Sequence, residues 1–257
     1  MKAMVSSTDE RTISVHQEHE FLKKLEVAGL TGEFAQKVID SKGNDLATKV
    51  VRLIQKGGFE PTTSQKRARE IMGRNFFGIE EAIKHFGVNP TRQQTLALSE
   101  IPFSEEVLQK AKDTHVLVAV FPLSILEIRG KVDSRLFCDQ SWYNEESVAR
   151  DRGKTSWHLV SKTPVNNSTS KNWEEQLALI GEEDEVPTAQ VMVYTIIGHY
   201  LATDERLFEH IYVRTSSVAS VGRRLFVGAF DLRGLYVCYD WDDYRSADLG
   251  VSSARKF

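Results

Sequence analysis

Two strands joined by a tight turn are encoded by residues 223–240, whose sequence is RRLFVGAFDLRGLYVCYD. Apolar residues recur at every second position in both halves of this stretch: Leu225, Val227, Leu235 and Val237. This period of two is typical of strands that bury one face. Residues 231–234 separate the two halves, and Gly234 supplies the glycine that a hairpin reversal needs. We expect one face of the hairpin to hold the fold and the other to be free to vary.

The segment that contains this hairpin has an unusual composition. Residues 211–255 include no Lys, Glu, Gln or Met in 45 positions, although the whole chain has 52 residues of these types. An even spread would place about nine of them there, given ordinary usage. Strands disfavour Glu and Lys, but this preference does not explain why Arg and Asp remain. Codons that end in a pyrimidine cannot encode Lys, Glu, Gln, Met or Trp, whatever their first two bases are. Randomising those two bases would therefore account for the four missing residue types. Because Trp is excluded as well, we expect Trp241 to be a fixed position.

The C-terminal part of the chain carries several short motifs: residues 223–231, Gly234-Leu235, Trp241-Asp242-Asp243 and residues 249–257. Together they resemble the variable region of the target proteins of diversity-generating retroelements. The helix opening Val186–Ala189 is similar to the Leu-Pro-Thr-Glu/Ala opening of the same lectin-like group. The resemblance covers roughly residues 113–257 and is strongest after Val186. It implies a C-type lectin fold, mutagenesis by a reverse transcriptase at adenines of a template, and ligand binding at exposed variable positions.

These observations predict an α+β chain with two domains. A small all-α module is expected over residues 1–112, where amphipathic stretches separated by Gly and Pro predict helices at 18–28, 32–41, 45–55, 63–72, 79–86, 91–98 and 104–112. The resemblance implies a C-type lectin-like (formylglycine-generating-enzyme-like) domain over residues 113–257, with a variable region at about 211–257. Within it, residues 115–129 predict a strand and residues 187–201 predict a helix.

We expect this domain to bind a macromolecular ligand, most simply a protein, without catalysis. The segment offers the mixture of Tyr, Ser, Arg and Asp that rigid binding surfaces use. Tyr236, Tyr239 and Tyr244 are the expected anchors. The further candidate contact or variable positions are Arg214, Ser216, Phe226, Ala229, Asp231, Cys238, Asp240 and Arg245. Four residues are expected to form the constant frame: Val227, Leu235, Val237 and Trp241.

The overall composition is that of an ordinary globular protein. The chain has 257 residues, 41% hydrophobic and 27% charged, with a net charge of -3, which argues against disordered and collagen-like classes. The longest apolar candidate, residues 191–201, is too short to span a membrane and is interrupted by Gly198 and His199. Residues 1–11 are polar and carry acids, so we expect no secretory signal and a cytoplasmic location. Display on a cell or particle stays open, as does a homo-oligomer.

No cofactor or metal is expected. No glycine-rich loop has the spacing of a nucleotide site, His16 and His19 lack further ligands, and the acids of residues 240–243 fit turns better than a calcium site. The resembled group includes formylglycine-generating enzymes, which depend on a closely spaced cysteine pair. Cys138 and Cys238 are far apart in the sequence, so we expect two unpaired thiols and no enzyme of this kind.

The main alternative is a DNA-binding regulator, although a pI near 6.2 gives no overall attraction for nucleic acid. Residues 79–98 have the pattern of a helix-turn-helix, with Arg92–Gln94 placed to meet base edges. Upstream cations could contact phosphates: Lys66, Arg67, Arg69 and Arg74. Helical hairpins of this shape are also common packing units, so we favour a structural role for them.

Overall fold

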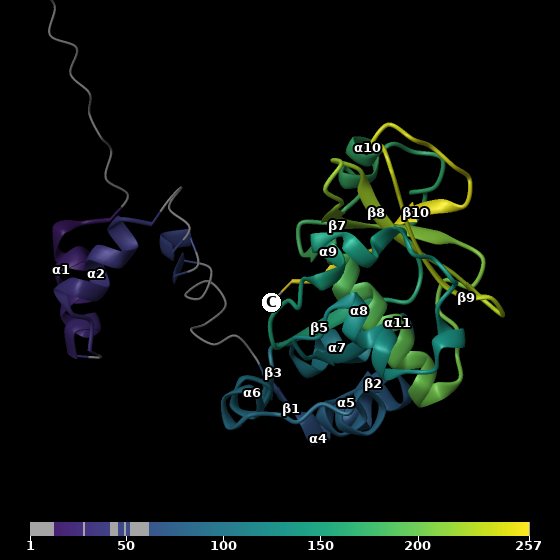
Figure 1. The fold of residues 1–257 in the computed structure, drawn as a ribbon. Coiled ribbons are helices and arrows are strands. Elements are labelled where there is room, and N and C mark those ends of the chain that lie inside the picture. Colours follow the sequence, from purple (N-terminus) through teal and green to yellow (C-terminus); the bar gives the residue numbers. More distant parts are fainter. Residues whose placement is uncertain (1–12, 28, 42–45, 49, 52–61, 257) are drawn as a thin grey trace, which may run out of the picture. The chain divides into compact units, whose positions relative to one another are not determined.

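The computed structural model describes residues 13–27, 29–41, 46–48, 50–51 and 62–256, and the chain divides into two compact units, residues 1–59 and 60–257 (Figure 1). The first unit contains α1 (Val15–Val27) and α2 (Gly32–Ile39). Thr31 caps α2 by accepting a hydrogen bond from the backbone N–H of Phe34 at 3.4 Å. Of the helix expected at 45–55, residues 46–48 and 50–51 are helical, and the other positions lie outside the described residues.

The boundary between the units differs from the one expected at residue 112. The helices α4 (Gln65–Met72), α5 (Ile79–Phe86), α6 (Arg92–Ala97) and α7 (Glu105–Ala111) all belong to the second unit. The physical reason is long-range packing. The short strand β2 (Phe76–Phe77) pairs in parallel with β4 (His115–Val120), and the ring of Phe86 lies 4.6 Å from that of Tyr194. The apolar faces of these helices therefore complete the core of the strand-rich part.

The helix expectations for residues 63–112 are confirmed within two residues at each end. Ser64, Thr91 and Ser104 cap α4, α6 and α7 through their side chains, as polar residues at these positions predict. The strand expected over residues 115–129 is shorter than predicted, because β4 ends at Val120 and α8 (Ile125–Lys131) follows. The Ser124 hydroxyl and the Glu127 carboxylate form a capping box there, which starts a helix within an apolar, β-branched run.

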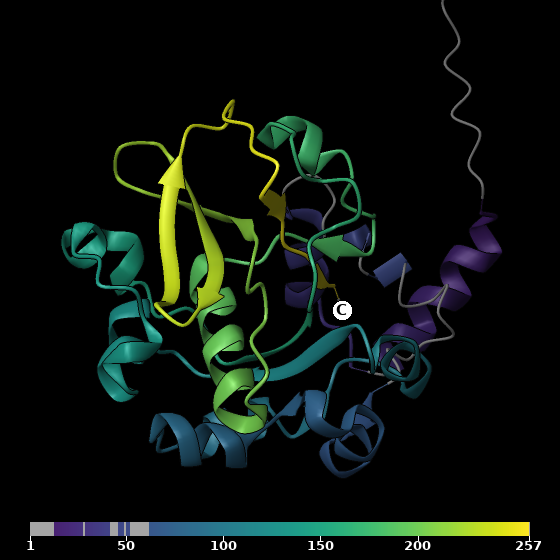
Figure 2. The ribbon, with the colours of Figure 1, turned by 90° about the vertical axis from the view of Figure 1, so that its right-hand side faces the viewer.

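One buried helix, α11 (Ala189–Thr203), lies at the centre of the second unit and confirms the helix expected at 187–201 (Figure 2). It contacts strands of two sheets. The five-stranded sheet has the order β2-β4-β5-β11-β6, and the four-stranded sheet has the order β10-β7-β8-β9. Their remaining strands are β5 (Ser156–Ser161), β6 (Asp184–Glu185), β7 (Tyr212–Val218), β8 (Arg224–Asp231), β9 (Gly234–Asp240), β10 (Leu249–Val251) and β11 (Ala254–Arg255). The second unit is thus α+β, as expected.

Smaller elements surround this core. A two-stranded sheet pairs β1 (Thr63–Ser64) with β3 (Glu100–Ile101). Two short helices, α9 (Ser147–Arg150) and α10 (Trp173–Leu177), lie between β4 and α11 in the sequence. Asn172 caps α10 by accepting a hydrogen bond from the Glu175 N–H at 2.9 Å. The cap fixes where α10 begins, next to the four-stranded sheet that it contacts.

The hairpin of β8 and β9 forms as the sequence predicts. Residues 231 and 234 are partners across the turn. The inner-face residues are fully buried: Val213, Leu225, Val227, Leu235 and Val237. The register shifts after Gly228, whose φ is 144° and where a Cβ would lie 2.2 Å from the Ile211 carbonyl oxygen. Only glycine fits this bulge, since a side chain would clash with the backbone of the neighbouring strand.

A substitution on the inner face tests directly whether its buried residues stabilise the fold. Leu225→Ala is expected to lower the free energy of unfolding by about 2–5 kcal/mol, because it removes a fully buried side chain from the core. Leu232→Ala, at the hairpin turn where the side chain is 89% exposed, is the control and is expected to change it by less than about 0.5 kcal/mol. Urea denaturation of the full chain measures both. Equal losses would contradict the assignment of the two faces.

Candidate ligand-binding face

The four-stranded sheet has an outer face opposite the buried one. The register places Tyr212 beside Gly228 and Gly228 beside Tyr236, and it places Phe226 beside Cys238. Residues paired in this way project from the same side of a sheet. Tyr212, Phe226, Tyr236 and Cys238 therefore share the outer face, where each is half-buried. We call these four residues the outer-face cluster.

The aromatic rings of the outer-face cluster pack against one another. The ring centroids of Tyr212 and Phe226 lie 5.3 Å apart at an interplanar angle of 84°, and those of Tyr212 and Tyr236 lie 6.3 Å apart at 79°. Gly228 lies between the two tyrosines in the register, so no side chain separates their rings. Edge-to-face contacts of this kind hold aromatic side chains in defined orientations. The cluster is therefore a preformed aromatic surface.

The tyrosine hydroxyls of the cluster remain neutral at physiological pH. Burial raises the pKa of Tyr212 to about 12, and the nearby Cys238 side chain adds to this effect. A hydrogen bond with the Cys138 side chain raises the pKa of Tyr236. A neutral phenol can both donate and accept a hydrogen bond. These two side chains therefore offer polar contacts together with apolar surface.

Both cysteines are free thiols: Cys238 belongs to the cluster, and Cys138 lies beside it. The backbone N–H of Cys138 donates to the Leu235 carbonyl at 3.0 Å, which brings this distant segment alongside β9. The Gln140 amide donates from Nε2 to Cys238 Sγ at 3.6 Å. Burial raises the pKa of the Cys238 thiol, so the thiol stays protonated near neutral pH and is a weak nucleophile.

Arg214 was expected among the contact residues, but it is fully buried. Its Nη1 donates to the Lys171 carbonyl at 3.0 Å and to Gln176 Oε1 at 2.9 Å, and its Nη2 donates to the Tyr244 carbonyl. Burial lowers the pKa of this guanidinium. Arg214 therefore ties β7 to α10 and to the loop that follows β9, and it lies out of reach of a ligand.

Tyr239 lies on the opposite side of β9 from Tyr236, because three positions separate them on a strand of period two. Its ring packs 4.2 Å from that of Trp142, whose Nε1 donates to the Val237 carbonyl at 2.8 Å. Tyr239 thus supports the strand instead of joining the outer-face cluster. Trp241 was expected in the frame, yet it is 50% exposed because it follows the last residue of β9.

The other predicted contact residues lie outside the cluster: four are in β7–β9 (Ser216, Ala229, Asp231 and Asp240), and two are in the loop after β9 (Tyr244 and Arg245). Arg245 pairs with Glu175 at 2.6 Å and Asp231 pairs with Arg233 at 2.7 Å, while Ala229 occupies the bulge with a φ of 45°. The exposed members are Ser216, Tyr244 and Arg245, and the half-buried members are Ala229, Asp231 and Asp240. The structure therefore brings Phe226, Tyr236 and Cys238 together and places these six elsewhere.

Sequence analysis missed Tyr212, which is central to the cluster. The sequence analysis predicted Arg214 and Ser216 as contact residues. Because side chains on one face of a strand recur at every second position, the same pattern would also have indicated Tyr212. The nearness of Cys138 had no comparable sequence signal. It depends on the bridge between Phe137 and Leu235, which joins positions far apart in the chain.

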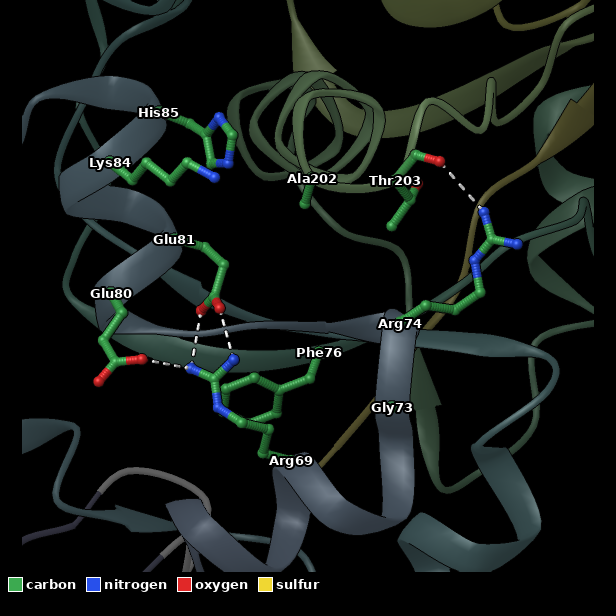
Figure 3. Close-up of a pocket in the computed structure, with 10 residues that line it drawn as sticks. All are labelled: Arg69, Gly73, Arg74, Phe76, Glu80, Glu81, Lys84, His85, Ala202 and Thr203. Carbon is green, nitrogen blue, oxygen red and sulfur yellow. Dashed lines mark hydrogen bonds and ion pairs between the residues drawn. The ribbon is translucent and has the colours of Figure 1, made fainter.

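A separate cavity of about 550 Å³ opens between α5 and the C-terminal end of α11 (Figure 3). On one wall, Arg69 pairs with Glu80 at 3.1 Å and with Glu81 at 2.5 Å. On the other, Arg74 donates to the Thr203 carbonyl at 3.3 Å. These charged groups therefore interact mainly with one another.

The cations of the DNA-binding alternative are also largely paired. Residues 79–98 form α5 and α6 as that alternative expects, but α6 has only six residues. Arg67 pairs with Glu70 at 3.2 Å and Glu105 at 2.9 Å, and Arg74 pairs with Glu205 at 3.2 Å. Such pairing reduces the positive charge that could neutralise phosphates. DNA binding stays the weaker hypothesis.

Comparisons of the chain with models of protein families, with curated proteins and with solved structures find no match. Within the described part of the chain, no three His, Cys, Asp or Glu residues gather as metal ligands. In that same part, no helix has the length and apolar character to cross a membrane.

The buried arginine gives the second prediction. Arg214→Met is expected to lower the free energy of unfolding by about 3 kcal/mol or more, because the buried acceptors around Arg214 lose their donors. Arg245→Met is the matched control. It removes an exposed arginine from a surface ion pair, so a loss below about 1 kcal/mol is expected. Thermal and urea unfolding of both full-length variants measure the difference, and a mild effect of Arg214→Met would refute its structural role.

Proposed function

We propose that the chain is a hypervariable ligand-binding protein, diversified by a retroelement, with a C-type lectin-like fold in its C-terminal part. It binds a macromolecular ligand, most simply a protein, through the outer-face cluster and without catalysis. The observation that carries the proposal is the separation of the two faces of β7–β9. Leucine and valine fill the inner face, while aromatic and thiol side chains occupy the outer face. This separation falls within the segment that lacks Lys, Glu, Gln and Met.

A prepacked aromatic surface suits such a function physically. Tyr and Phe have few rotatable bonds, and the rings of Tyr212, Phe226 and Tyr236 already contact one another. They lose little conformational freedom when a ligand binds, which favours affinity. Outer-face residues can also change without creating cavities under the sheet, because the core on the inner face is independent of them. Diversity and stability are thus compatible in one segment.

The raised pKa of Cys238 agrees with binding in preference to covalent catalysis. A nucleophilic cysteine needs a neighbouring base or cation that stabilises its thiolate. Here the nearby polar partner is the Gln140 amide, and burial favours the protonated thiol. In this proposal, Cys238 is a variable contact position, and other versions of the gene encode a different residue there.

The third prediction concerns the gene. Sequencing its surroundings is expected to reveal a reverse transcriptase gene and a near-copy of its 3′ end that differs mainly where the copy has adenine. Across many individuals of the source population, the codons for Phe226, Tyr236 and Cys238 should vary, whereas those for Val227 and Leu235 should not. Buried Arg214 should also be constant, since its contacts need a guanidinium.

Two results would contradict this proposal. One is the absence of both the reverse transcriptase gene and the near-copy. The other is variation spread evenly over the inner and outer positions of β8 and β9, because substitution on the inner face destabilises the fold. The inner positions serve as the internal control, since their codons lie in the same stretch of the gene as those of the outer positions.

A further inference from the structure

Two consecutive arginines, Arg223 and Arg224, have opposite environments. Arg224 donates from Nε and Nη2 to the Asp242 carboxylate at 2.7 and 3.0 Å, and from Nη1 to the Ser216 carbonyl at 3.3 Å. Its guanidinium also stacks on the Trp173 ring at 3.7 Å. Arg224 is therefore fully occupied by the protein itself.

Arg223 has aromatic neighbours but no acceptor. Its guanidinium lies 5.3 Å from the ring centroid of Tyr239 and 4.8 Å from that of Trp241. Its Nε is buried and has no hydrogen-bond partner. Among the described residues, no carboxylate or carbonyl pairs with its side chain. The guanidinium therefore lies beside two aromatic rings, and its buried Nε has no acceptor in the described part of the chain.

An arginine held in this way is prepared for an anionic partner. A guanidinium binds a carboxylate through two parallel N–H···O hydrogen bonds, and stacking on aromatic rings restricts the plane in which those bonds form. Leaving such donors unpaired costs stability. A carboxylate that binds the guanidinium costs little further side-chain freedom, because two aromatic rings already contact the arginine.

The neighbouring charges favour a single carboxylate over a polyanion. The chain next to Trp241 carries Asp240, Asp242 and Asp243. Asp242 is neutralised by Arg224, whereas Asp240 and Asp243 form no ion pair among the described residues. These acids would repel a nucleic acid or an anionic membrane more strongly than one acidic side chain.

We propose that Arg223, which the rings of Tyr239 and Trp241 contact, is a carboxylate-binding position that pairs with an Asp or Glu side chain of the protein ligand. This inference rests on the proposed function, because it names the chemistry of one contact that the ligand makes. It adds a cationic specificity position on the other side of the sheet from the outer-face cluster, because Arg223 contacts Tyr239, which faces away from Tyr236.

The experiment uses phage-displayed libraries of random peptides selected on the immobilised full-length chain. One library encodes all amino acids, and a second is identical except that Asp and Glu are omitted. The first is expected to yield binders enriched in Asp or Glu. These peptides should bind Arg223→Met at least about tenfold more weakly, which is the range of a charge-assisted hydrogen bond.

Two matched variants complete the experiment. Arg67→Met removes an arginine of α4 that pairs with Glu70 and Glu105, away from β7–β9, and it should leave peptide binding unchanged. Arg223→Lys keeps the charge but loses the planar fork, so it should also weaken binding. Replacing the acid of a selected peptide by its amide should cause the same loss, with little further loss on Arg223→Met. Arg223→Met keeps an apolar side chain beside the two rings, so an unchanged melting temperature is expected.

The outcomes separate the inference from the proposed function. Peptides that depend on Tyr236 but bind Arg223→Met as well as the original chain would overturn the carboxylate assignment alone. Binding of a single-stranded oligonucleotide that requires Arg223 would also overturn it, in favour of phosphate. Peptides that depend on neither Arg223 nor Tyr236, or the absence of selected binders from both libraries, would contradict the proposed function as well.

Discussion

Alternate side chains in the central parts of β7, β8 and β9 are buried in the core, and this alternation constrains the rest of the second unit. Leu225, Val227, Leu235 and Val237 have no exposed surface. Because strand side chains alternate, burying these residues directs their neighbours to the other side of the sheet. A shift of one residue in register would exchange the two faces. The apolar inner face therefore fixes where an outer face can exist.

Glycine and arginine refine this arrangement in different ways. Gly228 creates a bulge and leaves the space in which the rings of Tyr212 and Tyr236 meet. Arg214 projects from the side of β7 that carries the outer face, but it is covered by α10 and by the loop after β9. The same sheet face thus holds a buried polar anchor and an accessible aromatic surface. Arg223 and Arg224 differ in a related way: the guanidinium of Arg224 is paired with Asp242, whereas the buried Nε of Arg223 has no hydrogen-bond partner.

Local sequence signals predicted much of this fold. The helix at 79–86 agrees with its expected bounds, and the hairpin reversal at 231–234 forms where Gly234 indicated. Both depend on caps, turns and periodicity, which act within a few residues. The candidate site was predicted less completely. Phe226, Tyr236 and Cys238 share a face as a period of two requires, whereas Tyr239 is out of phase with them and packs on Trp142.

The sequence by itself determined the β8–β9 hairpin with its turn, the burial of Val227, Leu235 and Val237, and the restricted composition of residues 211–255. Only the tertiary structure decided that the unit begins near Glu60, that Arg214 is buried, and that Cys138 lies beside β9. The physical reason is the range of the interactions. Alternation and capping are set by neighbouring residues, whereas burial and side-chain pairing depend on which distant segments the packed core brings together.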